Sequence, residues 1–178
     1  METLPRFLKP PTGGFFLFGP RGTGKSTWLR GRYPEALTLD LLDPEAARAF
    51  MARPERLREA VDGHPGARQV VVDEIQRVPS LLNVVHQLVE RGGGRAPQFI
   101  LTGSSARKLK RAGVNLLAGR LLMKTMHPFM AAELGARFHL DRALRLGMLP
   151  LVHGSADPEE TLRAYVALYV REEVQAEG

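Results

Sequence analysis

The sequence lacks cysteine and long apolar runs, and each absence excludes a class of protein. Without cysteine, the 178 residues form no disulfides and no thiolate metal sites, which fits a cytoplasmic protein. The apolar runs are short, for example residues 15–18 and 70–72, and none approaches the roughly 20 residues that a membrane helix needs. The first 14 residues contain two adjacent prolines and do not resemble a secretory signal. The sequence therefore predicts a cytoplasmic protein without membrane insertion.

Acidic residues are fewer than basic ones, 19 against 25, and the net charge is +6. A basic balance suits anionic partners such as nucleotides, nucleic acid or membrane surfaces, and an arginine-rich surface without any partner explains it equally well. The densest basic run is ARKLKR at residues 106–111. No aromatic residue interrupts it, so a solvated helix face explains this run better than nucleic-acid binding does. The five histidines lack the spacing of a metal site.

Strand-like and helix-like segments alternate along the chain, which predicts an α/β fold with a parallel sheet. We expect strands at residues 15–18, 36–40, 69–74, 98–105 and 120–126. We expect helices at residues 25–32, 43–52, 54–63, 79–94, 106–119, 129–135, 140–148 and from 157 onward. Asp43 and Asp157 are each followed by proline, and we expect both to cap the helix that follows.

The segment GPRGTGKST, residues 19–27, follows the first expected strand and carries the strongest signal in the sequence. Two glycines enclosing four residues, then lysine and serine, are typical of a phosphate-binding loop. Glycines let the backbone wrap closely, so that its N–H groups and the next helix's positive end face the phosphates. Lys25 can reach the outer phosphates, and Ser26 offers a hydroxyl to magnesium. We therefore expect the whole segment to bind nucleotide: Gly19, Pro20, Arg21, Gly22, Thr23, Gly24, Lys25, Ser26 and Thr27.

An acidic pair, Asp73 and Glu74, ends the expected strand at residues 69–74. If this strand is a neighbour of strand 15–18, Asp73 holds magnesium directly or through water. Glu74 would then orient and activate an attacking water as the general base. A small-molecule kinase needs no such base, so the pair favours hydrolysis over phosphoryl transfer to a metabolite. The alternative is an exposed acidic turn at a strand end.

Hydroxyl side chains and an arginine complete the candidate site. Thr102, Ser104 and Ser105 stand at the carboxyl end of strand 98–105, where ligands bind in open α/β sheets. Ser104 could contact the water or the γ-phosphate, or it could cap the next helix. Arg120 opens the fifth expected strand, and an arginine can stabilise the charge that develops in phosphoryl transfer. A structural salt bridge suits Arg120 at least as well.

Four blocks stand in a characteristic order: FFLFGPRGTGKSTWL, VVVDEIQRVPSLLNVVHQLVE, FILTGSSARKL and NLLAGR. They cover most of residues 15–125 and resemble a prokaryotic family of AAA-like P-loop ATPases that carry a C-terminal domain of unknown function. The resemblance implies ATP and Mg²⁺ as cofactors and a parallel five-stranded sheet flanked by helices, the additional-strand P-loop fold. It also implies a role for each motif residue. Residues 19–27 bind phosphate, Asp73 binds magnesium, Glu74 activates water and Ser104 is sensor-like, whereas the role of Arg120 is left open.

We expect residues 1–150 to form a P-loop ATPase domain and residues 151–178 to form a helical segment. The stretch LRAYVALYVREEVQAE resembles the start of the family's region beyond the ATPase core. Family members are usually longer, so this segment is expected to begin a C-terminal region that is truncated or absent. Its apolar stripe is then expected to self-associate or to stay undocked. That stripe consists of Leu162, Tyr165, Val166 and Tyr169.

The expected function is magnesium-dependent binding and hydrolysis of ATP, coupled to a conformational change or to partner binding. The alternative is a nucleotide-gated switch with little intrinsic hydrolysis, which binds a protein, a second copy of the chain or nucleic acid. Phosphate release measured with and without such partners separates the two.

Overall fold

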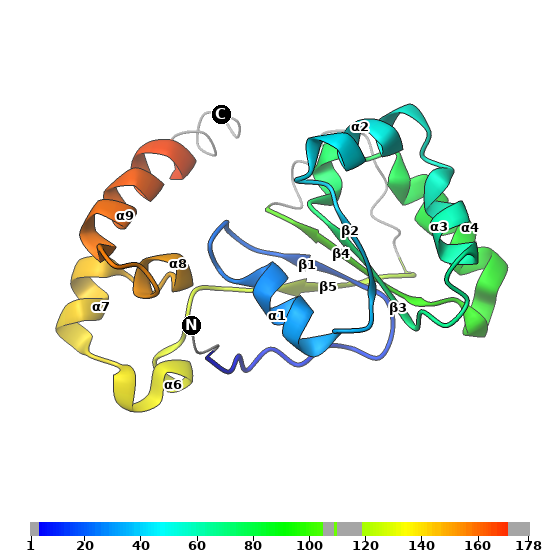
Figure 1. The fold of residues 1–178 in the computed structure, drawn as a ribbon. Helices are drawn as coiled ribbons and strands as arrows, with labels where there is room; N and C mark the ends of the chain where they lie inside the picture. Colours follow the sequence, from blue (N-terminus) through cyan, green and yellow to red (C-terminus); the bar gives the residue numbers. More distant parts are fainter. Residues whose placement is uncertain (1–3, 105–108, 110–118, 171–178) are drawn as a thin grey trace. The chain divides into compact units, whose positions relative to one another are not determined.

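The computed structural model describes residues 4–104, 109 and 119–170 (Figure 1). Expectations for Ser105, for most of the run at 106–111 and for residues 171–178 lie outside the described residues. Contacts divide the chain into two compact units. The sheet unit comprises Lys9–Gly19 and Leu29–Thr125, and the loop–helix unit comprises Met1–Leu8, Pro20–Trp28 and Met126–Gly178. Within the described ranges, no helix is both long and apolar enough to cross a membrane.

The sheet unit is built on five parallel strands in the order β2-β3-β4-β1-β5. They are β1 (Phe15–Phe18), β2 (Leu37–Asp40), β3 (Gln69–Asp73), β4 (Gln98–Gly103) and β5 (Leu122–Thr125). Each strand falls within one of the five expected segments, so the predicted parallel α/β class is confirmed. Because all strands run in the same direction, Phe18, Asp73 and Gly103 end at one edge of the sheet, which we call the carboxyl edge.

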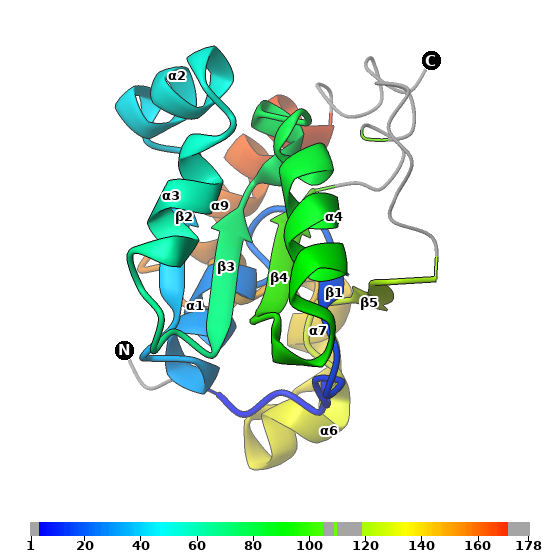
Figure 2. The ribbon, with the colours of Figure 1, turned by 90° about the vertical axis from the view of Figure 1, so that its right-hand side faces the viewer.

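One face of the sheet packs against helices of the same unit (Figure 2). These are α2 (Pro44–Ala52), α3 (Arg56–Asp62) and α4 (Leu81–Gly92). Alternate strand residues join side chains of the three helices in one buried cluster, which includes Phe16, Phe18, Val70, Val72, Phe99, Leu101, Ala47, Leu57, Val84, Val85 and Leu88. The strand residues between them, Phe15, Leu17, Val71 and Ile100, are also buried. Burial on both faces explains why β1, β3 and β4 contain continuous apolar runs.

Local signals set the helix boundaries. Asp43 accepts a hydrogen bond from the N–H of Glu45 at 3.0 Å, and Asp157 accepts one from Glu160 at 2.9 Å, so both predicted caps are confirmed. The helix α4 ends at Gly92, and the φ of 49° at the following Gly93 takes the chain out of the helix, within the segment 79–94 expected to be helical. Short 3-10 turns follow three elements: η1 (Ile75–Arg77), η2 (Gly93–Arg95) and η3 (Gly135–Arg137).

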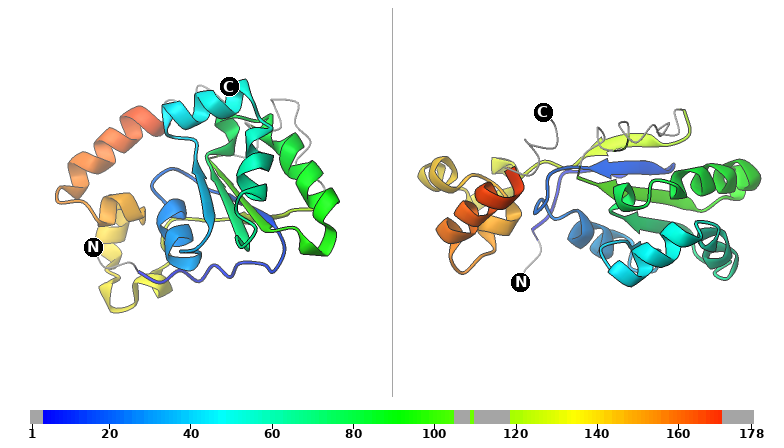
Figure 3. Two further views of the ribbon diagram at one scale, coloured as in Figure 1. Left: turned by 45° about the vertical axis from the view of Figure 1, so that its right-hand side comes forward. Right: turned by 90° about the horizontal axis from the view of Figure 1, so that it is seen from above.

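The loop–helix unit contains a group of short helices that follows β5 in the chain (Figure 3). They are α6 (Ala131–Leu134), α7 (Leu140–Leu146), α8 (Pro150–His153) and α9 (Pro158–Tyr165), and one π-helical turn, η4 (Val166–Val170), continues α9. The helix α1 (Lys25–Arg32) begins in this unit and ends in the sheet unit.

The start of α9 is docked, contrary to the expectation that its apolar stripe lacks a partner. Leu162 and Tyr165 pack against a small buried cluster formed by Leu146, Leu149 and Val152. Two of these residues precede position 150, so the stripe packs on part of the region expected to form the ATPase domain. The unanticipated helix α8 contributes Val152 to this cluster, and Leu149 immediately precedes α8. Beyond it, Val166 and Leu168 remain half or more exposed.

Candidate nucleotide-binding site

The phosphate loop leaves β1 at Gly19 and enters α1 at Lys25. Gly22 and Gly24 have φ angles of 76° and 86°, which residues with a Cβ rarely adopt. The glycine spacing in the sequence therefore has a direct backbone cause. Ser26 and Thr27 lie in the first turn of α1.

The loop is closed by its own side chains. The carbonyl oxygen of Pro20 accepts hydrogen bonds from Lys25 Nζ at 3.1 Å and from Thr23 Oγ1 at 2.8 Å. Thr23 is fully buried, and Lys25 is only 6% exposed. A buried ammonium attracts an anion more strongly than a solvated one does, because less water screens it. The loop therefore presents a fixed positive charge together with the N-terminal end of α1.

At the carboxyl edge, the hydroxyl of Thr102 joins the two acidic residues. Thr102 is fully buried; its Oγ1 donates a hydrogen bond to Asp73 Oδ1 and accepts one from the backbone N–H of Glu74 at 3.0 Å. Asp73 ends β3, and both acidic side chains are less than a tenth exposed. One neutral side chain on β4 thus contacts both the carboxylate of Asp73 and the backbone of Glu74.

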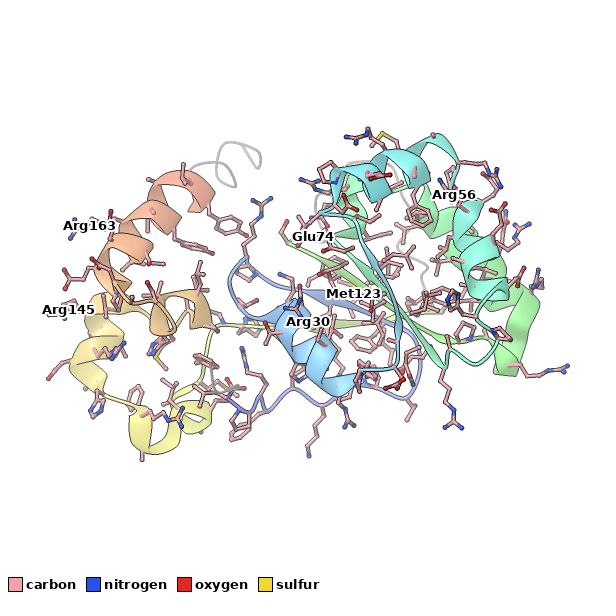
Figure 4. All side chains as sticks on the ribbon, viewed as in Figure 1. Arg30, Arg56, Glu74, Met123, Arg145 and Arg163 are labelled. Carbon is pink, nitrogen blue, oxygen red and sulfur yellow. The ribbon has the colours of Figure 1, made fainter. Side chains whose placement is uncertain are left out.

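Glu74 has a strained backbone. Its φ of 60° and ψ of 48° lie in the left-handed region, and no other non-glycine residue in the described parts of the chain has a positive φ. Such a conformation costs roughly 1–2 kcal/mol, and strain of this kind clusters at functional sites. The side chain is held by Gln76, whose Nε2 donates a hydrogen bond to Glu74 Oε2. Figure 4 labels Glu74 near the end of the strands.

Two buried polar atoms at this edge have no hydrogen-bond partner among the described residues: Ser104 Oγ and Gln76 Oε1. A Cβ placed on Gly103 would come within 2.6 Å of Gln76 Oε1, so this amide lies directly against the end of β4. An unsatisfied buried polar group costs about 1–3 kcal/mol. The cost is offset if water or a ligand supplies the missing partner.

The strand order corrects one condition of the sequence interpretation. The strands β1 and β3 are not neighbours, because β4 pairs with both of them. Strand spacing places the ends of β1 and β3 about 10 Å apart. Thr102 on the intervening strand β4, and Ser104 directly after that strand, therefore lie between the ends of β1 and β3.

Arg120 lies away from the carboxyl edge. It precedes β5, whose first residue, Leu122, pairs with Phe15 at the start of β1. Arg120 is therefore at the opposite edge of the sheet from the acidic pair. Its Nε donates a hydrogen bond to Glu90 on α4, and this bond and the charge of Arg120 lower the pKa of the Glu90 carboxyl. The salt bridge that the sequence left open for Arg120 is present.

Sequence reasoning missed three residues that hold the candidate site: Gln76, Arg6 and Tyr165. Gln76 follows Glu74 by only two positions in the DEIQ segment, so the sequence could have indicated that its side chain contacts the Glu74 carboxylate. Arg6 and Tyr165 contact the phosphate loop from 17 and 144 positions away, and no local pattern reports such contacts.

Comparison with known proteins adds a family. The model of a family described as "AAA domain" matches residues 13–135, which is more than half of the chain and includes the phosphate loop and the carboxyl edge. No curated protein matches the chain. A solved structure, domain III from the Thermotoga maritima replication initiation protein DnaA, matches with 12% identity and a TM-score of 0.40, covering 92% of this chain and 78% of that one.

Proposed function

Because the chain belongs to the AAA domain family, it is a nucleotide-binding module of the P-loop ATPase type, and we propose that it binds ATP with magnesium and hydrolyses it. The observation that carries the proposal is the arrangement of Asp73, Thr102 and Glu74 at the carboxyl edge. Ser104 Oγ, which has no hydrogen-bond partner among the described residues, directly follows the end of β4. The phosphate loop begins at the same edge, where β1 ends. The proposal requires the loop and the edge to act on one nucleotide.

In this proposal the loop binds the phosphates. Its N–H groups would donate to the phosphate oxygens, and Lys25 would neutralise the outer phosphates. The Lys25 ammonium is already held at the loop by its hydrogen bond to the carbonyl oxygen of Pro20, so little reorganisation is needed when an anion binds.

Ser26 and Asp73 are the residues proposed to hold magnesium. Asp73 fits this role, because it is a buried carboxylate whose Oδ1 is oriented by a hydrogen bond from Thr102, as oxygen ligands of metals usually are. Within the described ranges, no group of three or more His, Cys, Asp or Glu side chains could hold a metal ion. Magnesium commonly uses one or two protein oxygens together with substrate phosphates, so this sparse ligand set suits it. Bound with the nucleotide, the ion would neutralise charge on the β- and γ-phosphates.

Glu74 is proposed as the general base. It would accept a proton from a water that attacks the γ-phosphate, while Gln76 and Thr102 keep its carboxylate and backbone in place. Ser104 would donate to the γ-phosphate or to the attacking water, which satisfies its buried hydroxyl. Arg120 has no role within the same chain in this proposal, because it lies at the opposite edge.

Two measurements test the proposal: calorimetric titration with ATP and magnesium, and release of phosphate. We expect binding and slow release that requires magnesium, and we expect Lys25→Ala to weaken binding about 10- to 100-fold, the size of a charge-assisted hydrogen bond. Lys9→Ala, an exposed lysine outside the loop, serves as the control. Failure of the parent chain to bind ATP overturns the proposal. Binding without phosphate release, alone or with DNA, RNA or a protein partner, favours the nucleotide-gated switch instead.

A further inference from the structure

The carbonyl groups of three consecutive loop residues each accept a hydrogen bond from a different segment of the loop–helix unit. The three contacts are Tyr165 Oη to Arg21 O at 3.2 Å, Leu151 N to Gly22 O at 3.1 Å, and Arg6 Nη1 to Thr23 O at 2.8 Å. We propose that these donors form a clamp that fixes the phosphate loop from outside, and that Tyr165 and Arg6 are positioning residues for nucleotide binding. The effect on nucleotide affinity rests on the proposed function, whereas the clamp itself does not.

The clamp acts through the planarity of the peptide bond. The carbonyl group of one residue and the N–H group of the next lie in one rigid plane. Fixing the carbonyl groups of Arg21, Gly22 and Thr23 therefore fixes the directions of the N–H groups of residues 22, 23 and 24. These N–H groups are ones that a phosphate loop aims at its ligand. Ordering them before binding removes an entropy cost that the ligand would otherwise meet.

Packing at Gly22 supports the same contact. A Cβ on Gly22 would come within 2.9 Å of Leu151 Cβ and 3.4 Å of Leu149 Cδ2. The residues at the start of α8 thus lie directly against the loop backbone. Because Gly22 has no side chain, it permits both this close approach and the positive φ of the loop backbone.

Arg6 is a rigid donor. Its side chain is 8% exposed and pairs with Glu133, which is 3% exposed, at 3.2 Å. Its Nη2 also donates to the carbonyl oxygen of His127, and Glu133 accepts the N–H of Phe7 at 2.7 Å. The planar guanidinium donates to Glu133, Thr23 and His127 from three nitrogens held in one rigid plane, a geometry that the single nitrogen of an ammonium group does not reproduce. Arg6 therefore links the loop to the segment between β5 and α6.

Tyr165 is the donor that connects the loop to α9. Its ring packs on the small cluster of the helical group and lies 4.9 Å from the ring of Tyr169, measured between centroids. The guanidinium of Arg21 lies 5.8 Å from the centroid of the Tyr169 ring, which adds a second contact between the loop and this end of the chain. If α9 holds the loop, then by linkage a bound nucleotide must stabilise the contact of α9 with the loop to the same degree.

The test uses Tyr165→Phe, which removes the hydroxyl and keeps the packed ring. Hydrogen–deuterium exchange of residues 19–28 is measured first without nucleotide, and we expect exchange to become about 2- to 10-fold faster, the size of one net hydrogen bond. Calorimetric titration with ADP is expected to show affinity reduced by a similar factor. Arg163→Gln is the control, because Arg163 lies on the same helix with its side chain 78% exposed (Figure 4), and neither measurement should change.

Unchanged loop exchange in Tyr165→Phe would overturn the clamp. Faster exchange with unchanged ADP affinity would overturn the positioning role. If the parent chain binds no ADP, the proposed function fails, while exchange still decides whether the clamp exists. Arg6→Lys keeps a positive charge beside Glu133 but removes the planar guanidinium. We expect faster exchange in the loop and weaker binding of ADP, each by a factor equal to or larger than in Tyr165→Phe. The melting temperature of each variant separates loosening of the loop from global unfolding.

Discussion

The phosphate loop and the carboxyl edge are held in different ways. In the loop, the side chains of Thr23 and Lys25 donate hydrogen bonds to the carbonyl oxygen of Pro20. Three further loop carbonyl groups accept hydrogen bonds from residues far away in the sequence. At the edge, Glu74 has a strained backbone, and Ser104 Oγ and Gln76 Oε1 lack partners among the described residues. We infer that the loop is prepared for an anion in advance, whereas the edge is completed only by its ligand. Loss of the Glu74 carboxylate at the edge should therefore affect turnover rather than binding, and changes in the loop should affect binding and stability.

The largest expected effect is at the edge. Glu74→Gln preserves the shape of the side chain but removes its basicity, so we expect the rate of phosphate release to fall at least about 100-fold. Affinity for ATP should stay within about threefold of the parent, because the loop is unchanged. Glu45→Gln, an exposed substitution on α2, is the control. Full turnover in Glu74→Gln would show that the edge does not supply the base.

The second effect concerns the stability of the edge. Thr102→Val leaves the N–H of Glu74 without its acceptor and Asp73 Oδ1 without this donor. We expect the free energy of unfolding to fall by about 1–3 kcal/mol, the cost of an unsatisfied buried polar group. Urea denaturation measures it, with the exposed Thr38→Val as the matched strand control, expected within about 0.5 kcal/mol of the parent. Equal stability of the two variants would mean that Thr102 does not hold the acidic pair.

A comparison of substitutions at two loop glycines tests whether α8 contacts the loop. Gly22→Ala and Gly24→Ala both force an alanine into a positive φ, but of the two only the new Cβ at Gly22 meets other side chains, those of Leu151 and Leu149. We expect Gly22→Ala to lower the free energy of unfolding of the ligand-free chain by about 1 kcal/mol more than Gly24→Ala does, because overpacking adds to strain. Equal losses in denaturation experiments would argue against contact between α8 and the loop.

The smallest effect is expected at Arg120. The pKa of Glu90 is lowered in the folded chain, so the pair stabilises the fold above the unfolded pKa of glutamate and loses this contribution as the pH falls through the folded value. Arg120→Gln should raise the pKa of Glu90, which an NMR titration of its carboxyl group measures. The change in stability should be slight, since the ion pair is exposed. Loss of ATP turnover in this variant would instead indicate that Arg120 acts on the site of a second chain.

Much of the fold was predictable because its signals are local. The residues that predict a strand or a helix start lie within a few positions of each other at Phe15–Phe18, Val70–Val72 and Asp43. The structure has the expected strands and helix cap at these positions. The positions of Lys25, Asp73, Glu74 and Ser104 on their elements followed from the same signals. Their joint role in one site remains a prediction, as do the cytoplasmic location and a domain boundary at residue 150.

What the sequence did not provide depends on strand order and on long-range contacts. The position of β4 between β1 and β3 rests on strand pairings between residues far apart in the sequence. The pairing of β4 with β3 places Thr102 beside Asp73 and Glu74. The docking of Tyr165 depends on α8, a helix too short for its own periodicity to reveal. The opposite-edge position of Arg120 follows from parallel strand direction alone, and that inference was available from the sequence.

Trp28 gives the phosphate loop an optical reporter of its own. It is the single tryptophan of the chain, it lies in α1, and its backbone N–H donates to the carbonyl oxygen of Gly24 at 2.9 Å. Its emission therefore arises from one known place, directly beyond the loop, without any label. Stopped-flow fluorescence of the unmodified chain could then follow the arrival and departure of an anion in real time.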